Sequence, residues 1–163
     1  MDFYEAFRSA NKETFRLEML DQYIVDEEKE DFEAWKKGEP IDSSPGMKSW
    51  VSDLEMLRSR GVVTHRVHVV TFPLSEYLNY ELDAYKITKE EVSFIERKEY
   101  LKMKKPFEPK EFWIIDDSHV FVQNYDSEGH WLGSTYLPGK EEASRHSKIK
   151  ELLLSKALPL SEL

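Results

Sequence analysis

Two side chains that could bind a ligand or transfer a proton, Arg66 and His68, lie two residues apart in a segment with the alternation of a β-strand. Because successive side chains of a strand point to opposite faces, residues 62–71 place Arg66 and His68 on one face together with Thr64 and Val70. A guanidinium group in such a position can form paired hydrogen bonds with a carboxylate or a phosphate. The segment therefore predicts a strand with one polar face that is suited to ligand binding.

A helix that follows this strand carries further polar side chains. Pro73 ends the strand because it cannot donate to a sheet ladder, and apolar residues then recur at helical spacing over residues 74–82. Tyr77, Tyr80 and Glu81 could converge with the arginine and the histidine above the carboxyl end of the strand, where α/β proteins commonly bind ligands. The sequence thus predicts a site for a small anionic ligand, formed by these residues.

The same residues also have a purely structural interpretation. Arg66 could pair with Glu81 or with another of the many acidic side chains, and His68 could be a half-buried residue whose hydrogen bonds are satisfied within the protein. Structural ion pairs orient such groups as readily as binding sites do. The residue types and their spacing leave both interpretations open.

Asp116 and Asp117 form a second candidate, because adjacent carboxylates can bind a metal or divide the roles of acid and base. Consecutive residues of a strand point to opposite faces, however, and aspartate is common in turns. A turn is therefore the simpler interpretation, and the pair is retained only as candidate ligand-binding residues. The sequence predicts neither a metal site nor a cofactor.

Composition limits the classes of function. The 163 residues include 23 basic and 32 acidic side chains, for a net charge of -9, and no basic stripe that suits phosphates, which argues against a nucleic-acid partner. The absence of cysteine excludes disulfides, thiolate nucleophiles and zinc ribbons, and is compatible with a cytoplasmic location. No apolar run reaches membrane-spanning length, and the amino-terminal residues lack the pattern of a signal peptide. We therefore expect a cytoplasmic protein with no membrane partner.

Length and pattern predict a single mixed α/β domain over residues 1–163, helical in residues 1–60 and sheet-rich in residues 61–163. The expected architecture is a central mixed sheet with amino-terminal helices, a carboxyl-terminal antiparallel meander and a closing helix. Periodicity and turn residues place helices at 3–10, 31–37, 50–57 and 141–154, a loop at 38–46, a short turn leading into a strand at 88–95, and the meander strands at 112–115, 119–125 and 130–136.

Four stretches of the chain resemble, in order, a family of uncharacterised bacterial proteins that is abundant in actinomycetes. They are FRLEMLDQY at 15–23, RGVVTHRVHVVTFPLSEYLNYEL at 60–82, FWIIDDSHVFVQNYDSEGHWLG at 112–133, and ALPL at 157–160. That family is known only as a domain of unknown function, and its genes often lie near helix-turn-helix regulators. The resemblance implies a transcriptional regulator or a neighbouring gene product as a possible protein partner, and it supplies no catalytic residue.

The order of elements also resembles one half of a phospholipase D-like fold. Active members of that fold carry His-x-Lys-x-x-x-x-Asp, with the aspartate at a hairpin turn, the histidine as nucleophile and the lysine holding the phosphate. If Asp116 is the turn aspartate here, Pro109 and Glu111 occupy the histidine and lysine positions. The alignment shifted by one residue, onto Asp117, also supplies no nucleophile. The resemblance therefore implies a degenerate phospholipase D-like fold.

Three functions are consistent with these observations. The absence of the nucleophile favours a non-catalytic regulatory domain that binds a ligand or a partner. The alternative is an enzyme, a phosphodiesterase or nuclease, in which His68 or His119 acts as the base and Asp116 or Asp117 assists it. An antitoxin-like protein that binds a basic partner would fit the negative charge.

Overall fold

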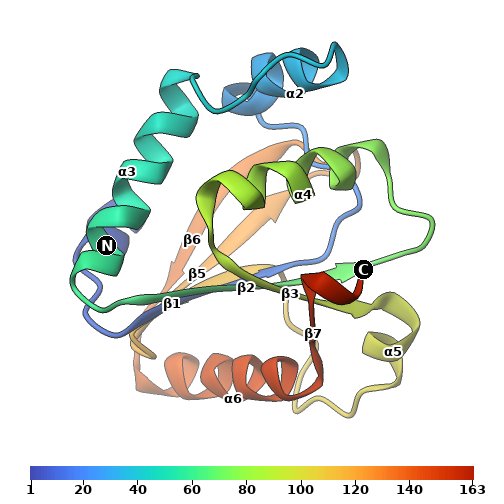
Figure 1. Ribbon diagram of the computed structural model, residues 1–163. Helices are drawn as coiled ribbons and strands as arrows, with labels where there is room; N and C mark the ends of the chain where they lie inside the picture. Colours follow the sequence, from blue (N-terminus) through green and yellow to red (C-terminus); the bar gives the residue numbers. More distant parts are fainter.

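Seven β-strands form one mixed sheet at the centre of the computed structural model, which describes residues 1–163 (Figure 1). The strand order across the sheet is β6-β5-β4-β1-β2-β3-β7. The strands are β1 (Glu13–Glu18), β2 (Val63–Val70), β3 (Glu91–Glu96), β4 (Phe112–Ile115), β5 (His119–Tyr125), β6 (Trp131–Leu137) and β7 (Leu158–Pro159).

The sheet combines a parallel half with an antiparallel half. β1, β2 and β3 are parallel neighbours, and helical crossovers connect them. β4 pairs antiparallel with β1 and continues into the meander β4-β5-β6, while the short β7 pairs antiparallel with β3. β1 therefore lies in the middle of the sheet, between β4 and β2, and its polar residues Thr14, Arg16 and Glu18 are buried.

Helices cover both faces of the sheet (Figure 1). α2, α3 and α4 lie on one side, together with α1, whose residues pack with α3 against β4 and β5. α5 and α6 lie on the other side. The helices are α1 (Phe3–Arg8), α2 (Lys29–Lys36), α3 (Pro45–Ser59), α4 (Glu76–Thr88), α5 (Arg97–Lys102) and α6 (Lys140–Lys156), with single 3-10 turns at Asp26–Glu28 and Leu160–Glu162.

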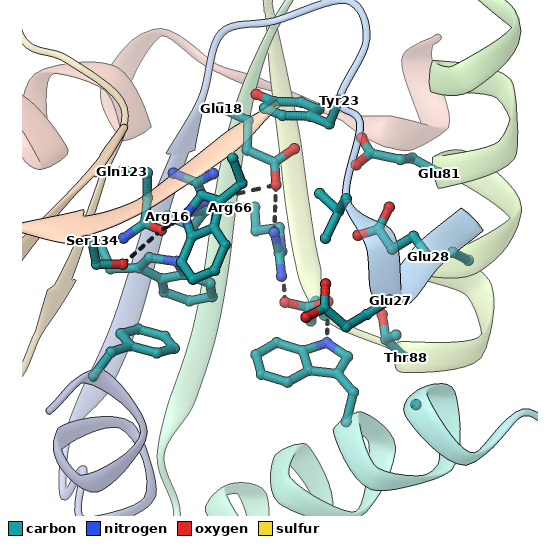
Figure 2. A pocket seen from close by; sticks show the side chains of 18 of the residues that line it. Arg16, Glu18, Tyr23, Glu27, Glu28, Arg66, Glu81, Thr88, Gln123 and Ser134 are labelled. Carbon is teal, nitrogen blue, oxygen red and sulfur yellow. Dashed lines mark hydrogen bonds and ion pairs between the residues drawn. The ribbon is translucent and has the colours of Figure 1, made fainter. Parts of the chain in front are cut away.

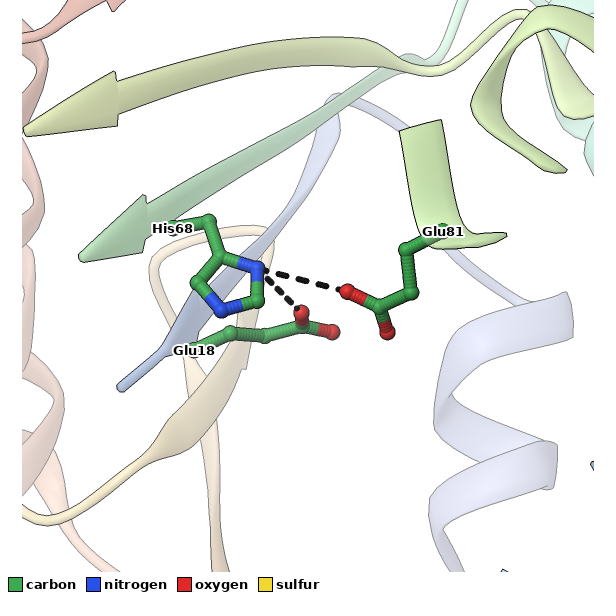
Figure 3. A group of neighbouring side chains, drawn as sticks. All are labelled: Glu18, His68 and Glu81. Atoms are coloured by element: carbon green, nitrogen blue, oxygen red, sulfur yellow. Dashed lines mark ion pairs between the residues drawn. The ribbon is translucent and has the colours of Figure 1, made fainter. Parts of the chain in front are cut away.

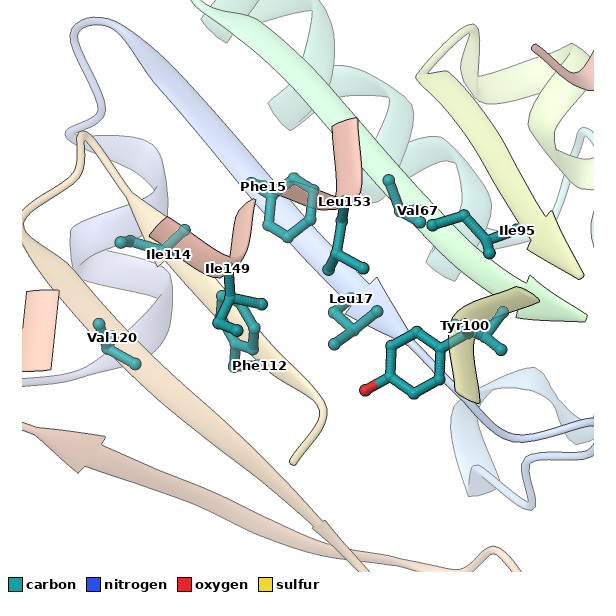
Figure 4. Close-up of a cluster of buried hydrophobic side chains, with 11 residues drawn as sticks. Phe15, Leu17, Val67, Ile95, Tyr100, Phe112, Ile114, Val120, Ile149 and Leu153 are labelled. Carbon is teal, nitrogen blue, oxygen red and sulfur yellow. The ribbon is translucent and has the colours of Figure 1, made fainter. Parts of the chain in front are cut away.

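The face of the sheet beneath α6 is apolar. Phe15 and Leu17 of β1 and Val67 of β2 are fully buried there and pack against Ile149 and Leu153 of α6 (Figure 4). Burial of each such side chain contributes about 1.5–3 kcal/mol to folding. Because alternate residues of β1 and β2 are used for this core, the intervening polar residues must face α1 to α4.

Two helices next to that polar face begin at serine caps. The hydroxyl of Ser44 accepts a hydrogen bond from the amide of Met47 at the start of α3, and Ser75 does the same for Leu78 at the start of α4. Lys89 caps the carboxyl end of α4, and its φ of 57°, in the left-handed region, turns the chain into β3. These ends fix how far α3 and α4 extend over the sheet.

The mixed α/β class and most elements predicted from the sequence are confirmed. β2, the meander and α6 match their predicted segments closely, whereas α4 continues to Thr88, beyond the predicted end at residue 82. Three elements were not predicted, namely β1, α5 and β7, and β1 lies inside the segment expected to be helical. No helix combines the length and the apolar character needed to cross a membrane.

Candidate ligand-binding cavity

Two adjacent parallel strands bring four charged side chains together on the face covered by α1 to α4. The register of β1 and β2 places Arg16 beside Arg66 and Glu18 beside His68. All four side chains are almost completely buried. Two neighbouring arginines would repel each other in such a place, so the arrangement requires carboxylates close by.

Glu18, which points toward Arg66 in Figure 2, and Glu90 supply those carboxylates to Arg66. Nη1 of Arg66 donates to Oε1 of Glu18 at 2.5 Å, and its Nε donates to Oε1 of Glu90 at 2.7 Å. Burial by itself would lower the pKa of Arg66, but the Glu90 and Glu18 carboxylates raise it well above its usual value. Arg66 is therefore permanently charged, and two carboxylates occupy its Nε and Nη1 donors.

Arg16 also donates hydrogen bonds to groups within the protein. Its Nη1 donates to the carbonyl oxygen of Leu17 at 3.0 Å, and its Nη2 donates to the hydroxyl of Tyr125 at 2.9 Å. Oε1 of Glu111 lies 3.7 Å from Nη2, and Oε1 of Glu18 lies 3.8 Å from Nε. The two arginines and their carboxylates thus form one ion-paired network along the sheet.

His68 lies between two carboxylates behind this network (Figure 3). Its Nδ1 is 3.0 Å from Oε2 of Glu18 and 3.4 Å from Oε2 of Glu81, while its Nε2 is 2.9 Å from the carbonyl oxygen of Leu20. Burial alone would lower the pKa of His68, but hydrogen bonds and charge from Glu18 and Glu81 raise it to about 10. Both ring nitrogens are therefore donors, and the imidazolium has no lone pair with which to act as a nucleophile or base at neutral pH.

Glu18, His68 and Glu81 also have the residue types and spacing of a metal site. One ligand atom from each lies within 4.8 Å of the others. A metal would need a neutral histidine and free carboxylates. Here the guanidinium of Arg66 and the imidazolium already neutralise Glu18, so the ion pairs account for the cluster without a metal.

A cavity of about 600 Å³ lies between this network and the helices above it (Figure 2). β1, β2, β4, β5 and β6 form its floor, and α1, α3, α4 and the segment before α2 form its walls. Aromatic side chains make up much of its lining, namely Phe3, Tyr4, Tyr23, Trp50, Tyr77, Tyr80, Tyr85, Trp113, Phe121, Tyr125, Trp131 and Tyr136. A cavity of this size and lining is typical of a small-molecule site.

Acidic side chains line one side of the cavity, across from Arg16, Gln123 and Ser134 (Figure 2). Glu28, from the 3-10 turn before α2, accepts a hydrogen bond from the hydroxyl of Tyr77 at 2.5 Å. Burial and the nearby charge of Glu81 raise the pKa of Glu28 to about 7, against the lowering effect of the tyrosine. This side of the cavity has carboxylates but no basic side chain.

Most residues of the site predicted from the sequence lie at this cavity. Arg66, Tyr77, Tyr80 and Glu81 line it, while His68 contacts Glu81 from behind the wall. Glu81 does not pair with Arg66 but contacts His68 and the hydroxyl of Tyr85. Helix α4 therefore does converge with β2, although the partners differ from those expected.

Asp116 and Asp117 lie away from the cavity, in the turn between β4 and β5. Asp116 accepts hydrogen bonds from the backbone amides of residues 11–13 at 2.9, 2.7 and 3.0 Å. Asp117 pairs with Lys150 at 2.5 Å and accepts a hydrogen bond from Ser147 at 2.7 Å. The pair attaches the start of β1 and α6 to this turn, and these contacts correspond to the structural interpretation.

Several residues of the cavity could not be assigned from the sequence, chiefly Arg16, Glu18, Glu28 and Glu90. A signal for two of them exists, because Arg16 and Glu18 alternate with apolar residues over Thr14–Glu18. Glu28 and Glu90 lie in connecting segments, where a glutamate has no pattern that separates it from the many others.

The structure also shows what occupies the positions of the phospholipase D motif. Glu111, at the lysine position of the alignment on Asp116, is buried and accepts a hydrogen bond from the amide of Met19 at 3.1 Å. Its second donor is the hydroxyl of Tyr23. A carboxylate that is held in this way cannot replace a lysine that binds phosphate.

Solved structures with the same fold confirm the phospholipase D-like layout. Nuc from Salmonella typhimurium, a phospholipase D family member, is 11% identical, with a TM-score of 0.53 over 95% of this chain and 86% of Nuc. NucT from Helicobacter pylori is 10% identical, with a TM-score of 0.54 over 96% of this chain and 87% of NucT. At these identities the likeness concerns the fold alone.

TrmBL2, an archaeal chromatin protein with a novel mode of DNA binding, has a similar fold, with 14% identity and a TM-score of 0.50. The match covers 96% of this chain, which spans about half of TrmBL2 (48%). The expectation about partners, which set nucleic acid aside in favour of a protein or a small anion, is therefore wrong. A negative net charge does not exclude nucleic acid as a partner for a fold that occurs in a DNA-binding protein. Arg66, which was expected to bind a small anion, is already paired with the carboxylates of Glu18 and Glu90.

No curated protein matches this sequence. The model of one protein family matches the whole chain, residues 1–163, and its description agrees with the resemblance found in the four sequence stretches. The chain belongs to the family described as Domain of unknown function (DUF6879).

Proposed function

We propose that this protein is a non-catalytic regulatory domain that binds a small organic molecule in the cavity above β1 and β2. One observation carries the proposal. The charge of Arg66 on the floor of the cavity is balanced by ion pairs, whereas the aromatic lining encloses about 600 Å³ of space. Natural ligand sites commonly have volumes of about 300–1,000 Å³ and a mostly apolar lining with a few fixed polar groups.

The state of the polar groups supports binding rather than catalysis. A hydrolase of the alternative class needs a histidine with a free lone pair next to the substrate. His68 donates from both ring nitrogens and is separated from the cavity by the side chains that it contacts. Arg66, which could hold a phosphate, has Glu18 and Glu90 on its donors instead.

A thermal-unfolding screen tests the proposal. Purified protein is heated with members of a metabolite library, and a compound present at 100 times its Kd should stabilise the protein by about 2.7 kcal/mol. Ala84→Trp, on the cavity wall, fills the space and should abolish the stabilisation. Lys86→Trp, two residues further along α4 with a side chain that is 78% exposed, is the matched control.

The rival activity is measured on the same protein. Hydrolysis of bis(p-nitrophenyl) phosphate that is lost in His68→Gln would refute the non-catalytic assignment. The absence of any compound whose stabilisation depends on Ala84 would refute ligand binding in the cavity. Intrinsic fluorescence provides a second reading, because Trp50, Trp113 and Trp131 line the cavity.

A further inference from the structure

The charges that line the cavity do not balance. Seven carboxylate side chains line it, against two guanidinium groups, with the amino-terminal Met1 at its edge. The guanidinium of Arg66 is taken by Glu18 and Glu90, and that of Arg16 is taken by Glu18 and Glu111. The arginines are thus balanced by their own partners, and the imidazolium of His68 contacts Glu81 from behind the wall. The excess of negative charge in the cavity therefore comes from its other carboxylates, those of Asp2, Glu27, Glu28 and Asp31.

The excess is concentrated at Glu28 and its neighbours. Glu28 has only the hydroxyl of Tyr77 as a donor, and Asp31 has only the hydroxyl of Ser44. Glu81 is close enough to Glu28 for its charge to disfavour ionisation of that carboxyl group. Like charges held together at the edge of a low-dielectric space favour the entry of a cation.

Aromatic rings surround these carboxylates. The ring of Tyr77 lies 5.8 Å from that of Tyr23 and 5.7 Å from that of Tyr80, measured between centroids. All three line the cavity beside Glu28 and Glu81. Ring faces attract organic cations, and a carboxylate next to them adds a full opposite charge.

The other half of the cavity already contains this chemistry with a cation in place. The guanidinium carbon of Arg66 lies 5.1 Å from the ring of Trp113 and 5.8 Å from that of Tyr85, and its donors contact Glu18 and Glu90. There the protein supplies its own positive charge. At Glu28 the rings and carboxylates recur, but no basic side chain of the protein lines that side.

We propose that the cavity binds an organic cation, an amine or a quaternary ammonium compound, with its charge beside Glu28 and its apolar part against Tyr23, Tyr77 and Tyr80. This inference rests on the proposed function and specifies its ligand class. The raised pKa of Glu28, caused by burial and by the charge of Glu81, is the behaviour of a carboxylate that lacks a cationic partner. A bound cation would favour ionisation of Glu28.

Isothermal titration calorimetry with matched probes tests the ligand class. Tyramine is compared with tyrosol, and choline with 3,3-dimethylbutan-1-ol, since each pair has a similar shape and differs in charge. We expect at least one cation to bind about tenfold or more tightly than its neutral counterpart, as cation–π contact and a carboxylate together provide. Glu28→Gln should remove this preference, because glutamine can still accept the Tyr77 hydroxyl bond but has no charge. Glu76→Gln, on α4 with a side chain that is 65% exposed, is the matched control.

The results separate this inference from the proposed function. Equal binding of cation and neutral probe, or cation binding that Glu28→Gln and Asp31→Asn leave unchanged, would overturn the ligand class. If neither cation binds by 10 mM while library compounds still stabilise the protein in a manner that Ala84→Trp abolishes, the ligand class is wrong and the binding function holds. If the library also yields no such compound, both are wrong. Circular dichroism of each variant shows that a lost affinity is not lost folding.

Discussion

Replacing His68 by glutamine should make the stability of the protein less dependent on pH between 7 and 9. Burial opposes the charge of His68, but Glu18 and Glu81 outweigh it and raise the pKa from 6.5 to about 10 in the folded state. The folded state therefore keeps a proton that the unfolded chain releases near pH 6.5. The stabilisation is complete below that pH and is lost as the pH rises towards 10, by about 1.4 kcal/mol per pH unit. From pH 7 to 9 the wild type should lose roughly 3 kcal/mol relative to His68→Gln.

Urea unfolding followed by tryptophan fluorescence at pH 7, 8 and 9 measures this difference. His119→Gln is the matched control, because its ring contacts the hydroxyl of Tyr136 and no carboxylate. A difference between wild type and His68→Gln that stays constant over these three pH values would refute the assignment of a charged His68. Should the variant fail to fold, the ring signals of His68 in the wild type decide by NMR, since they should not titrate between pH 6 and 8.5.

Three further changes test other parts of the site. Arg66→Met should destabilise the protein by about 3–5 kcal/mol, because Glu18 and Glu90 would stay buried without a partner, and adding Glu90→Gln should recover part of the loss in urea unfolding. Asp116→Ala should cost about 1–2 kcal/mol, because three backbone amides, two of them exposed to water, lose their acceptor and because alanine is strained at a φ of 53°. Asp116→Asn should cost less, measured by the same method. The affinity of the cavity for a cation should fall as the pH drops from 8 to 6, because Glu28 gains its proton near pH 7. The charged and titratable groups around Glu28 are Tyr77, Glu81, Glu18 and Arg66. Calorimetry on Glu28→Gln should show no such fall.

Local periodicity was sufficient to predict the strand and helix that carry half of the site. β2 alternates between a face packed on α6 and a polar face, and α4 follows after Pro73, so Arg66, Tyr77 and Glu81 could be placed close together before their partners were known. The meander was equally clear because turn residues separate its strands. These elements are determined by neighbours in sequence, which is the information that a pattern contains.

β1 was missed for a physical reason. The central strands of parallel sheets usually carry apolar residues on both faces, whereas β1 presents Arg16 and Glu18 to a buried face. Leu20, which follows the strand, also breaks its alternation. Only the ion pairs supplied by distant segments make such a strand stable, and no local pattern reveals those segments.

The same long-range pairing explains why an anion was the wrong ligand to expect. Once parallel register places Arg16 beside Arg66, the protein must supply carboxylates from β1 itself and from the end of the α4–β3 connection, and it does so with Glu18 and Glu90. An isolated arginine in a sequence suggests a site for a phosphate or a carboxylate. An arginine whose charge is already balanced by buried carboxylates attracts an anion weakly. The charge that the cavity can still attract is then set by its remaining acids, among them Glu28, whose one donor is the hydroxyl of Tyr77.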